Sequence, residues 1–288
     1  MAQVSRFGQD GAGQLRPCSP GRPPSSSCKL CLMIPIRIAG VIPARLSSTR
    51  LSRKVLREIA GRPMVEWVWR AATASGWMDP VVVATDSGEV AAVCRERGIS
   101  VLMTSPECAS GSDRVREAAQ QIDAGIYVNI QGDEPTLTAE FFPPLLKLFD
   151  RPEVEVATLA VRCPVEEIAD PNAVKVVTAL DGRALYFSRS TIPYDRDGCR
   201  GREIARDSTG FTGYRKHLGI YAYRKAALER FAALAPSPLE LAERLEQLRL
   251  LENGIALYVA EAPGDTIGVD TEADLLRAEA VLRERASS

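Results

Sequence analysis

The residues best suited to chemistry follow a short apolar stretch between positions 126 and 135. Residues 126–130 (IYVNI) have the apolar, aromatic and β-branched side chains typical of a strand, and residues 131–135 (QGDEP) end it. In an open α/β sheet, ligands bind beyond the carboxyl ends of the strands. Asp133 therefore stands where a carboxylate could hold Mg²⁺ against phosphate oxygens, with an ordinary turn as the alternative.

A second group of polar residues follows another apolar stretch, residues 36–42 (IRIAGVI). The loop behind it holds three hydroxyl residues at 47–49 and four cations, which are Arg45, Arg50, Arg53 and Lys54. Arginine forks, a lysine charge and backbone amides suit a triphosphate, whereas a solvated basic loop is the alternative. The sequence has no G-x-x-x-x-G-K-[ST] and no G-x-G-x-x-G, so neither a Walker loop nor a dinucleotide site is supported.

Composition limits the class of protein. The chain has 288 residues, of which 45% are hydrophobic and 25% charged, and its formal net charge is -1. These values predict one large or two modest domains with a sizeable core. The near-neutral charge does not favour a nucleic-acid partner, and no apolar run is long enough to predict a membrane span.

The cysteine and histidine content argues against a metal site built from these residues. Seven cysteines occur at irregular spacing, which predicts reduced thiols in a cytoplasmic enzyme. Cys28 and Cys31 form the one suggestive pair, but a second pair and a nearby histidine are missing, so a zinc site is not expected. His217 is the single histidine, which excludes any site that needs two.

Residues 1–33 differ in composition from the rest of the chain. They are rich in Gly, Ser, Pro and Arg without periodicity, which predicts a disordered extension before a folded domain at 34–288. A transit peptide is an alternative, although the amphipathic pattern is missing and prolines cluster at 19–24. Met33 directly precedes the first predicted strand, so residues 1–32 are hypothesised to be dispensable or to reflect an incorrectly assigned start.

The order of the predicted elements indicates an α/β fold. In the first half, strands at 36–42, 81–85, 99–103 and 126–130 alternate with helices at 64–76, 89–97 and 112–122. Strands and helices that alternate through short links predict a mostly parallel sheet with right-handed crossovers, flanked by helices. In this arrangement the polar residues that follow the strands are expected at one edge of the sheet.

The second half predicts the rest of the sheet and a smaller mixed subdomain at about 184–254. Strands are expected at 154–161, 173–179, 184–187, 213–224 and 255–260, with a tight turn at 181–182 and a mobile loop at 195–213. A capping box at 237–240 opens one helix that carries Leu241, Leu245 and Leu248 on one face and ends at 253–254. Asp270 or Thr271 could cap a final helix.

Ordered sequence blocks resemble a known family. Residues 41–45 (VIPAR), 48–51 (STRL), 84–86 (ATD), 110–114 (SGSDR) and 129–135 (NIQGDEP) resemble blocks of the CMP-sugar synthetases. The later blocks at 172–175, 186–189, 216–221, 236–240, 245–249 and 268–271 narrow the resemblance to the 3-deoxy-manno-octulosonate (Kdo) cytidylyltransferases. The resemblance covers roughly residues 38–285 and implies a Rossmann-like nucleotidyltransferase domain, with the smaller subdomain serving sugar binding or dimerisation.

The resemblance also implies a reaction. CTP and Kdo would give CMP-Kdo, for lipopolysaccharide synthesis, and pyrophosphate, with Mg²⁺ as cofactor and a homodimer as the expected assembly. The anomeric hydroxyl of the sugar would attack the α-phosphorus, and catalysis would consist mainly of alignment and charge neutralisation.

Site residues are implied position by position. Nucleotide binding is implied for Ala44, Arg45, Arg50, Lys54, Ser110, Gly111, Arg114 and Gln131; catalysis for Lys54, Asp133 and Asp270, the two aspartates as metal ligands; and sugar binding for Arg189, His217, Tyr221, Glu246 and Gln247. Simpler roles remain open, because an aspartate at 270 could cap a helix, residues 246–247 could face solvent, and a lone histidine is often a core residue.

The chain also departs from the family pattern. Residues 51–56 read LSRKVL where the family usually reads LPGKPL, Leu241 replaces a histidine, and residues 108–109 replace His-Gln. These departures leave two alternatives open. One is a cytidylyltransferase for a related 2-keto sugar acid, such as sialic acid or amino-Kdo, and the other is a nucleotide-binding relative that has lost catalysis.

Overall fold

The computed structural model of the chain describes residues 36–46, 51–108, 110–196 and 213–287. The predicted extension at 1–33, the proposed start at Met33, Arg50 and most of the loop predicted at 195–213 lie outside these residues. The chain divides into two units, Met1–Pro35 and Ile36–Ser288, and the second contains everything described below. None of the helices in the described ranges is long and apolar enough to cross a membrane.

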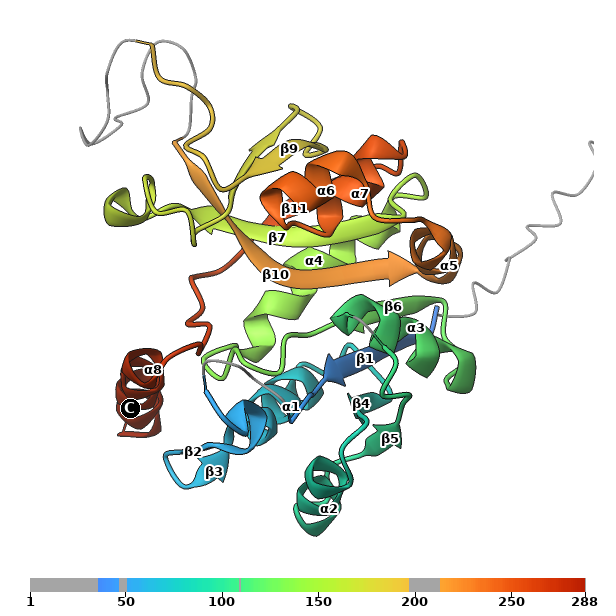
Figure 1. Cartoon of the computed structure of the whole chain (residues 1–288), viewed down its shortest axis with the longest axis vertical. Helices are drawn as coiled ribbons and strands as arrows, with labels where there is room; N and C mark the ends of the chain where they lie inside the picture. Colours follow the sequence, from blue (N-terminus) through green and yellow to red (C-terminus); the bar gives the residue numbers. More distant parts are fainter. Residues whose placement is uncertain (1–35, 47–50, 109, 197–212, 288) are drawn as a thin grey trace, which may run out of the picture. The chain divides into compact units, whose positions relative to one another are not determined.

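A mixed sheet forms the centre of the second unit (Figure 1). Within the described residues the strand order is β11-β7-β10-β6-β1-β4-β5, and β8 pairs with β10 and β9. The bounds are β1 (Ile38–Pro43), β4 (Val81–Thr85), β5 (Val101–Met103), β6 (Ile126–Asn129), β7 (Val156–Arg162), β8 (Lys175–Thr178), β9 (Ala184–Ser188), β10 (Arg215–Arg224) and β11 (Leu257–Glu261). β1 runs parallel to β4 and β6, whereas β10 runs antiparallel to β6 and β7.

The predicted α/β fold with a mostly parallel sheet is confirmed in this arrangement. The middle of β1 is fully buried, as its apolar run predicts for a strand covered on both faces. The parallel register of β1 with β4 and β6 brings the carboxyl ends of the three strands to the same edge. The loops after Pro43, Thr85 and Asn129 therefore start side by side.

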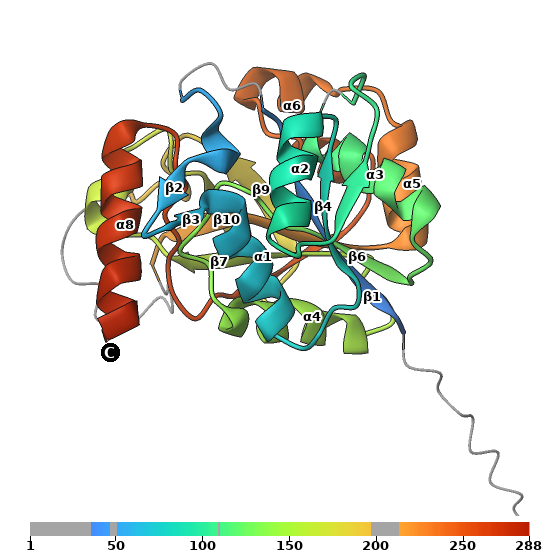
Figure 2. The ribbon, with the colours of Figure 1, turned by 90° about the horizontal axis from the view of Figure 1, so that it is seen from below.

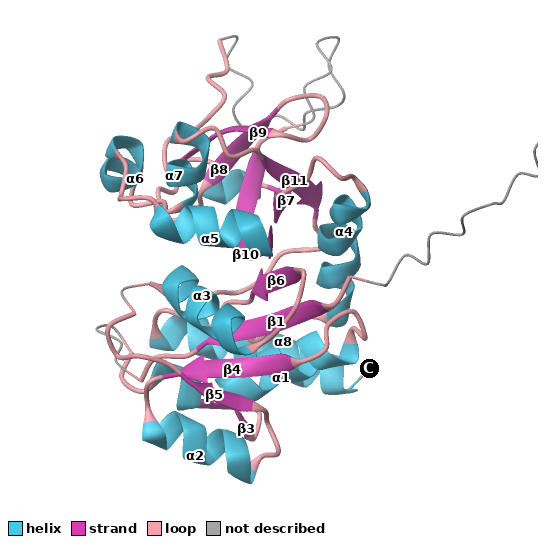
Figure 3. Cartoon of the chain, turned by 90° about the vertical axis from the view of Figure 1, so that its right-hand side faces the viewer, coloured by secondary structure: helices cyan, strands magenta, loops and turns pink. Residues whose placement is uncertain are grey.

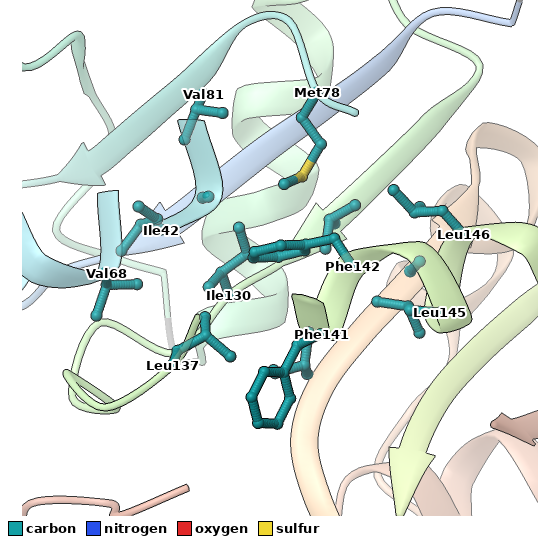
Figure 4. Packing of buried hydrophobic residues seen from close by; sticks show 14 of the residues in the cluster. Ile42, Val68, Met78, Val81, Ile130, Leu137, Phe141, Phe142, Leu145 and Leu146 are labelled. Atoms are coloured by element: carbon teal, nitrogen blue, oxygen red, sulfur yellow. The ribbon is translucent and has the colours of Figure 1, made fainter. Parts of the chain in front are cut away.

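Helices cover both faces of the sheet (Figure 3). Their bounds are α1 (Met64–Ala74), α2 (Gly88–Glu96), α3 (Gly111–Gln121), α4 (Phe142–Lys147), α5 (Lys225–Ala233), α6 (Pro238–Glu243), α7 (Gln247–Glu252) and α8 (Glu272–Ser287). One core cluster joins the sheet to α1, α2 and α4, and a second joins it to α3, α5 and α7. Figure 4 shows Phe142 of α4 pointing toward Ile130, just beyond β6, in the first cluster.

A third, smaller cluster attaches the C-terminal helix. A short hairpin of β2 (Glu58–Ile59) and β3 (Arg62–Pro63) lies beside α8 (Figure 2). Ile59, Leu275 and Leu282 are buried together there, with Val269 from the segment before the helix. This packing fixes the start of α8 close to the loop that follows β1.

The structure corrects the helix predicted after Ser237. The capping box between Ser237 and Glu240 is present, but Arg244 adopts a left-handed conformation (φ 54°) and divides the segment into α6 and α7. Leu241 is 65% exposed rather than buried with Leu245. A left-handed residue ends an α-helix. The spacing of the leucines carries no information about the backbone conformation of Arg244, and the prediction therefore missed the break.

The end of the chain resolves the question of the last cap. Thr271 Oγ1 accepts a hydrogen bond from the amide of Asp274, and Asp274 Oδ2 accepts one from the amide of Thr271. Thr271 therefore caps α8, so this capping role is not needed to explain Asp270.

Candidate active site

Asp133 and Asp270 meet at the ammonium group of Lys54. Lys54 Nζ lies 2.6 Å from Asp133 Oδ2 and 2.8 Å from Asp270 Oδ1. Burial by itself would lower the pKa of Lys54, but the two carboxylates outweigh it and raise that pKa above its ordinary 10.5. The three residues predicted to be catalytic are thus brought together, from three distant parts of the sequence.

Short backbone and side-chain contacts hold the two acidic segments together. The amide of Val269 donates to the carbonyl of Asp133 at 2.9 Å, and the amide of Ile267 donates to Thr136 Oγ1 at 2.8 Å. Gly132 allows the loop to pass close to β1, because a Cβ at that position would lie 3.0 Å from the carbonyl oxygen of Pro43. These contacts set the position of Asp270 beside Asp133.

Glu134, for which the motifs predicted no role, lies buried behind Asp133. Its Oε2 accepts a hydrogen bond from Thr266 Oγ1 at 3.0 Å, which adds another link between the two segments. Burial, followed by the negative charge of Asp133, raises the pKa of Glu134 to about 7. The site thus places a strongly perturbed carboxyl group directly next to the predicted metal ligands.

The basic loop is only partly described. Arg45 Nη2 donates to the carbonyl of Cys108 at 2.9 Å, which ties the loop after β1 to the loop after β5, and Ala44 is buried. Arg53 has a left-handed backbone (φ 54°), where the family pattern has glycine, and its guanidinium pairs with Glu89. Lys54 therefore lies in the site, Arg45 links the loops that follow β1 and β5, and Arg50 lies outside the described residues.

The N-terminus of α3 faces the end of β1. Ser110 caps the helix through a capping box with Asp113, and a Cβ on Gly111 would lie 3.6 Å from Pro43. Free amides and the helix dipole make such an N-terminus favourable for a phosphate or another polar ligand group. The predicted nucleotide residues Ser110 and Gly111 thus lie next to the strand that leads to the basic loop.

Arg114 is fully buried below this helix start. Its guanidinium donates to Thr104 Oγ1 at 2.6 Å and lies 3.2 Å from Asp86 Oδ2. Among the buried polar atoms of the described residues, Arg114 Nε and Asn129 Oδ1 lack a hydrogen-bond partner. Buried polar atoms are normally satisfied, so these two mark hydrogen-bonding capacity that a ligand could use.

His217 and Tyr221 lie together on β10. Their ring centroids are 5.3 Å apart, and the ring centroid of Phe187 lies 5.0 Å from that of His217 in an edge-on arrangement. Burial lowers the pKa of His217 to about 3, so the imidazole is neutral at physiological pH. Burial, followed by the charges of neighbouring groups, also raises the pKa of Tyr221 well above 10, so both side chains act as neutral hydrogen-bonding groups.

Arg189 contacts a different set of groups. Its Nε donates to the carbonyl of Glu243 at 2.8 Å, and its Nη1 donates to the carbonyl of Pro171 at 2.9 Å. The Glu243 carboxylate in turn accepts from the amide of Arg189 and from Ser188 Oγ. Glu243 lies in no predicted motif. Its carboxylate and its carbonyl nevertheless hold Arg189 in place directly after the end of β9.

The remaining predicted residues connect the sugar side to the nucleotide side. Glu246 Oε2 accepts from Ser112 Oγ at 2.9 Å, directly beside Gly111 at the start of α3. Gln131 Nε2 donates to the carbonyl of Gly219 at 3.0 Å, which links the loop after β6 to β10. Gln247 is buried, so residues 246–247 do not form a solvated helix face.

Comparison with known proteins identifies the family. Residues 39–260 match the family model described as "Cytidylyltransferase". The chain belongs to the cytidylyltransferase family. A 3-deoxy-manno-octulosonate cytidylyltransferase of Acidobacterium capsulatum is 63% identical to this cytidylyltransferase over 253 residues, which are 88% of this chain and 99% of the relative. The enzyme of that name from Koribacter versatilis is 53% identical over 250 residues, which are 87% and 92%.

A solved structure gives the same result. The cytidylyltransferase chain superposes on a CMP:2-keto-3-deoxy-manno-octonic acid synthetase complexed with CTP, with a TM-score of 0.79 and 39% identity. The match covers 86% of this chain and 99% of the other. The resemblance to Kdo cytidylyltransferases inferred from the ordered motifs is therefore confirmed.

Proposed function

We propose that this chain transfers CMP from CTP to the anomeric hydroxyl of Kdo, releasing pyrophosphate and giving CMP-Kdo for lipopolysaccharide synthesis. The observation that carries the proposal is the convergence of Lys54, Asp133 and Asp270 at the sheet edge where the nucleotide loops begin. The names of the relatives, and the CTP complex of the similar synthetase, support both substrates.

The nucleotide would lie along the carboxyl ends of β1 and β6. Arg45, Arg50 and Lys54 would bind the triphosphate, because arginine forks and a lysine charge neutralise phosphate oxygens. Ser110, Gly111 and Arg114 would hold the nucleoside at the start of α3, with Ala44 and Gln131 beside it. The unpartnered Nε of buried Arg114 supports this assignment, since a ligand atom could satisfy it.

Mg²⁺ would be held by Asp133 and Asp270. Their carboxylates are hard oxygen ligands, and both already contact a cationic group, the Lys54 ammonium. Mg²⁺ commonly takes one or two protein carboxylates, with water and substrate phosphates as its other ligands, so this pair fits the ion. When bound, the ion would supply charge neutralisation at the phosphates and help to orient them.

The sugar acid would lie toward β10 and α7. Arg189 is the cation proposed for the Kdo carboxylate, and Glu246 and Gln247 offer hydrogen-bonding groups for its hydroxyls. His217 and Tyr221 are neutral, so they would bind hydroxyls rather than the carboxylate. These groups would align the anomeric hydroxyl for attack on the α-phosphorus, and alignment of this kind supplies much of the rate.

We also propose that the enzyme is a cytoplasmic homodimer. Cys94, Cys108 and Cys163 are free thiols, as expected in a reducing compartment. Leu180 and Leu185, on the hairpin of β8 and β9, are large exposed apolar residues that a partner subunit could cover. Sedimentation analysis tests this: Leu185→Glu should shift a dimer toward monomer, and a wild-type monomer would contradict the assembly.

The function is tested by CTP-dependent pyrophosphate release with three acceptors. Kdo should give the highest kcat/KM and a product with the mass of CMP-Kdo, whereas sialic acid and amino-Kdo should react poorly. Preference for another acceptor would replace Kdo as the substrate. Tight CTP binding without turnover of any acceptor would favour a binding protein over an enzyme.

A further inference from the structure

An irregularity in β10 lies between the two substrate regions. The register of β10 against β7 shifts between Leu218 and Tyr221, with Gly219 inside the irregular segment. Such bulges redirect side chains and free backbone groups from the regular ladder. Gln131 Nε2 donates a hydrogen bond to the carbonyl of Gly219. The carbonyls of Leu218 and Ile220 instead face the side chain of Thr158 on β7.

Thr158 is fully buried. Its Oγ1 lies 2.7 Å from the carbonyl oxygen of Ile220 and 3.2 Å from that of Leu218, and 3.0 Å from Nε2 of His217. A threonine hydroxyl has one proton to donate and can accept further hydrogen bonds. Carbonyl oxygens accept but cannot donate, so the hydroxyl proton belongs to the carbonyls of the bulge.

This leaves the hydroxyl only one way to bind His217. With its proton used for a carbonyl, Thr158 Oγ1 must accept a proton from Nε2 of the imidazole. The reverse arrangement would aim lone pairs of the Thr158 oxygen and the Ile220 carbonyl at each other across 2.7 Å. The neutral ring therefore carries its proton on Nε2, and Nδ1 keeps an acceptor lone pair.

We propose that Thr158 is a positioning residue for sugar binding, whose hydroxyl holds His217 in the Nε2–H form and leaves Nδ1 to accept a hydrogen bond from a substrate hydroxyl. Within the described residues no hydrogen bond to Nδ1 is found, and His217 as a whole residue is only partly buried. Phe187 and Tyr221 pack against the ring and keep its plane in place. The inference deepens the proposed function, because it assigns the histidine a defined role as an acceptor.

The chain offers a direct measurement, since His217 is its single histidine. Protein labelled with ¹⁵N-histidine gives one pair of ring nitrogen signals, and their shifts distinguish a protonated from an unprotonated nitrogen. The wild type should show protonated Nε2 and unprotonated Nδ1, without titration between pH 8 and pH 5.5. A wild-type ring protonated on Nδ1 would overturn the proposal.

Three variants separate the hydroxyl from general stability. Thr158→Val keeps the shape but removes the hydroxyl, and it should produce a mixed or reversed tautomer and a sugar KM up to about tenfold higher, as expected for the loss of one hydrogen bond. Thr158→Ser should keep the wild-type tautomer and a sugar KM within about threefold. Val156→Ala, in the buried core of the same strand, should lower the melting temperature without changing the tautomer.

The outcomes also distinguish this inference from the proposed function. An unchanged tautomer in Thr158→Val, or an equal rise in sugar KM in Val156→Ala, would refute the role of Thr158. Failure of the wild type to use Kdo, with the expected tautomer, would refute only the substrate. If Thr158→Val does not fold, Thr158→Ala replaces it, and the wild-type spectrum still tests the tautomer.

Discussion

Val269 donates its backbone amide to the carbonyl of Asp133 at 2.9 Å, and this hydrogen bond is one of the contacts that hold the two acidic segments side by side. Because it joins main-chain atoms, the pairing survives substitution of either aspartate side chain. Charge at the site can therefore be changed without moving the segments that carry it.

Asp133→Asn should abolish most turnover and leave the fold intact. An amide is a weaker ligand for Mg²⁺ than a carboxylate and does not neutralise charge, so kcat should fall by about 10²–10³, the typical loss for one group that stabilises the transition state electrostatically. Pyrophosphate release measures kcat, and circular dichroism checks the fold. Asp123→Asn, at an exposed position, is the matched control and should behave as wild type. Equal turnover in the two variants would refute the role of Asp133.

Lys54→Met should make the enzyme more responsive to Mg²⁺ while lowering its activity. The Lys54 ammonium contacts both carboxylates and offsets one of their two negative charges, so its removal leaves more charge for a divalent ion to satisfy. We expect a larger rise in melting temperature with added MgCl₂ in Lys54→Met than in wild type. The double variant Lys54→Met/Asp133→Asn should lose this response. Identical shifts in all three proteins would show that the ion binds elsewhere.

Arg189→Ala should raise the KM for the sugar and leave the KM for CTP unchanged. Hydrogen bonds from a charged donor contribute about 1.5–3 kcal/mol, which corresponds to a change of about 10- to 150-fold. Because the guanidinium also binds the carbonyls of Pro171 and Glu243, Arg189→Lys should recover only part of the loss. A change confined to the KM for CTP would show that Arg189 belongs to the nucleotide site.

Glu240→Gln should remove a pH-dependent part of the stability. Burial opposes ionisation of Glu240, but Arg249 and the amide of Ser237 outweigh it and hold the pKa below its ordinary 4.5. A lowered carboxyl pKa gives stability that is present above pH 4.5 and is lost as the pH falls through the folded-state pKa. Wild type should therefore lose stability below pH 4.5 more steeply than the variant.

Urea unfolding at several pH values measures this difference. At pH 7 the variant should be less stable by about 3 kcal/mol, since it leaves Arg249 without its charged partner. Arg230→Gln, which breaks an exposed pair with Glu155, should cost less than about 1 kcal/mol. Parallel pH curves for wild type and Glu240→Gln would contradict the assignment.

The strands were the most predictable part of the fold. Residues 81–85 have a continuous β-branched and apolar run, and β4 has these bounds because every one of its side chains is buried in the sheet. Two helices were not predicted. Pro143 and Pro144 in α4 suggest a turn, yet proline is tolerated in the first helical turn, and α5 follows β10 without a linking loop that would signal a new element.

The site was predictable only where a motif carries it. Asp133 and Asp270 were named from their blocks, but their meeting at Lys54 depends on how α8 packs against β2 and β3, which no local pattern records. Thr158 lies inside an apolar strand, where a hydroxyl gives no signal of its own. Its importance becomes visible only when the bulge of β10 is placed against it.

The pairing of β10 limits how the preference for a sugar acceptor could change. One strand presents His217 and Tyr221, pairs with β6 and β7, and accepts the Gln131 hydrogen bond at Gly219. Inserting or deleting a residue there would turn every following side chain to the opposite face and misalign both neighbouring strands at once. On the proposed assignment of His217 and Tyr221 to the sugar, acceptor preference would change through exchange of side chains on β10, while the length of the strand stays constant.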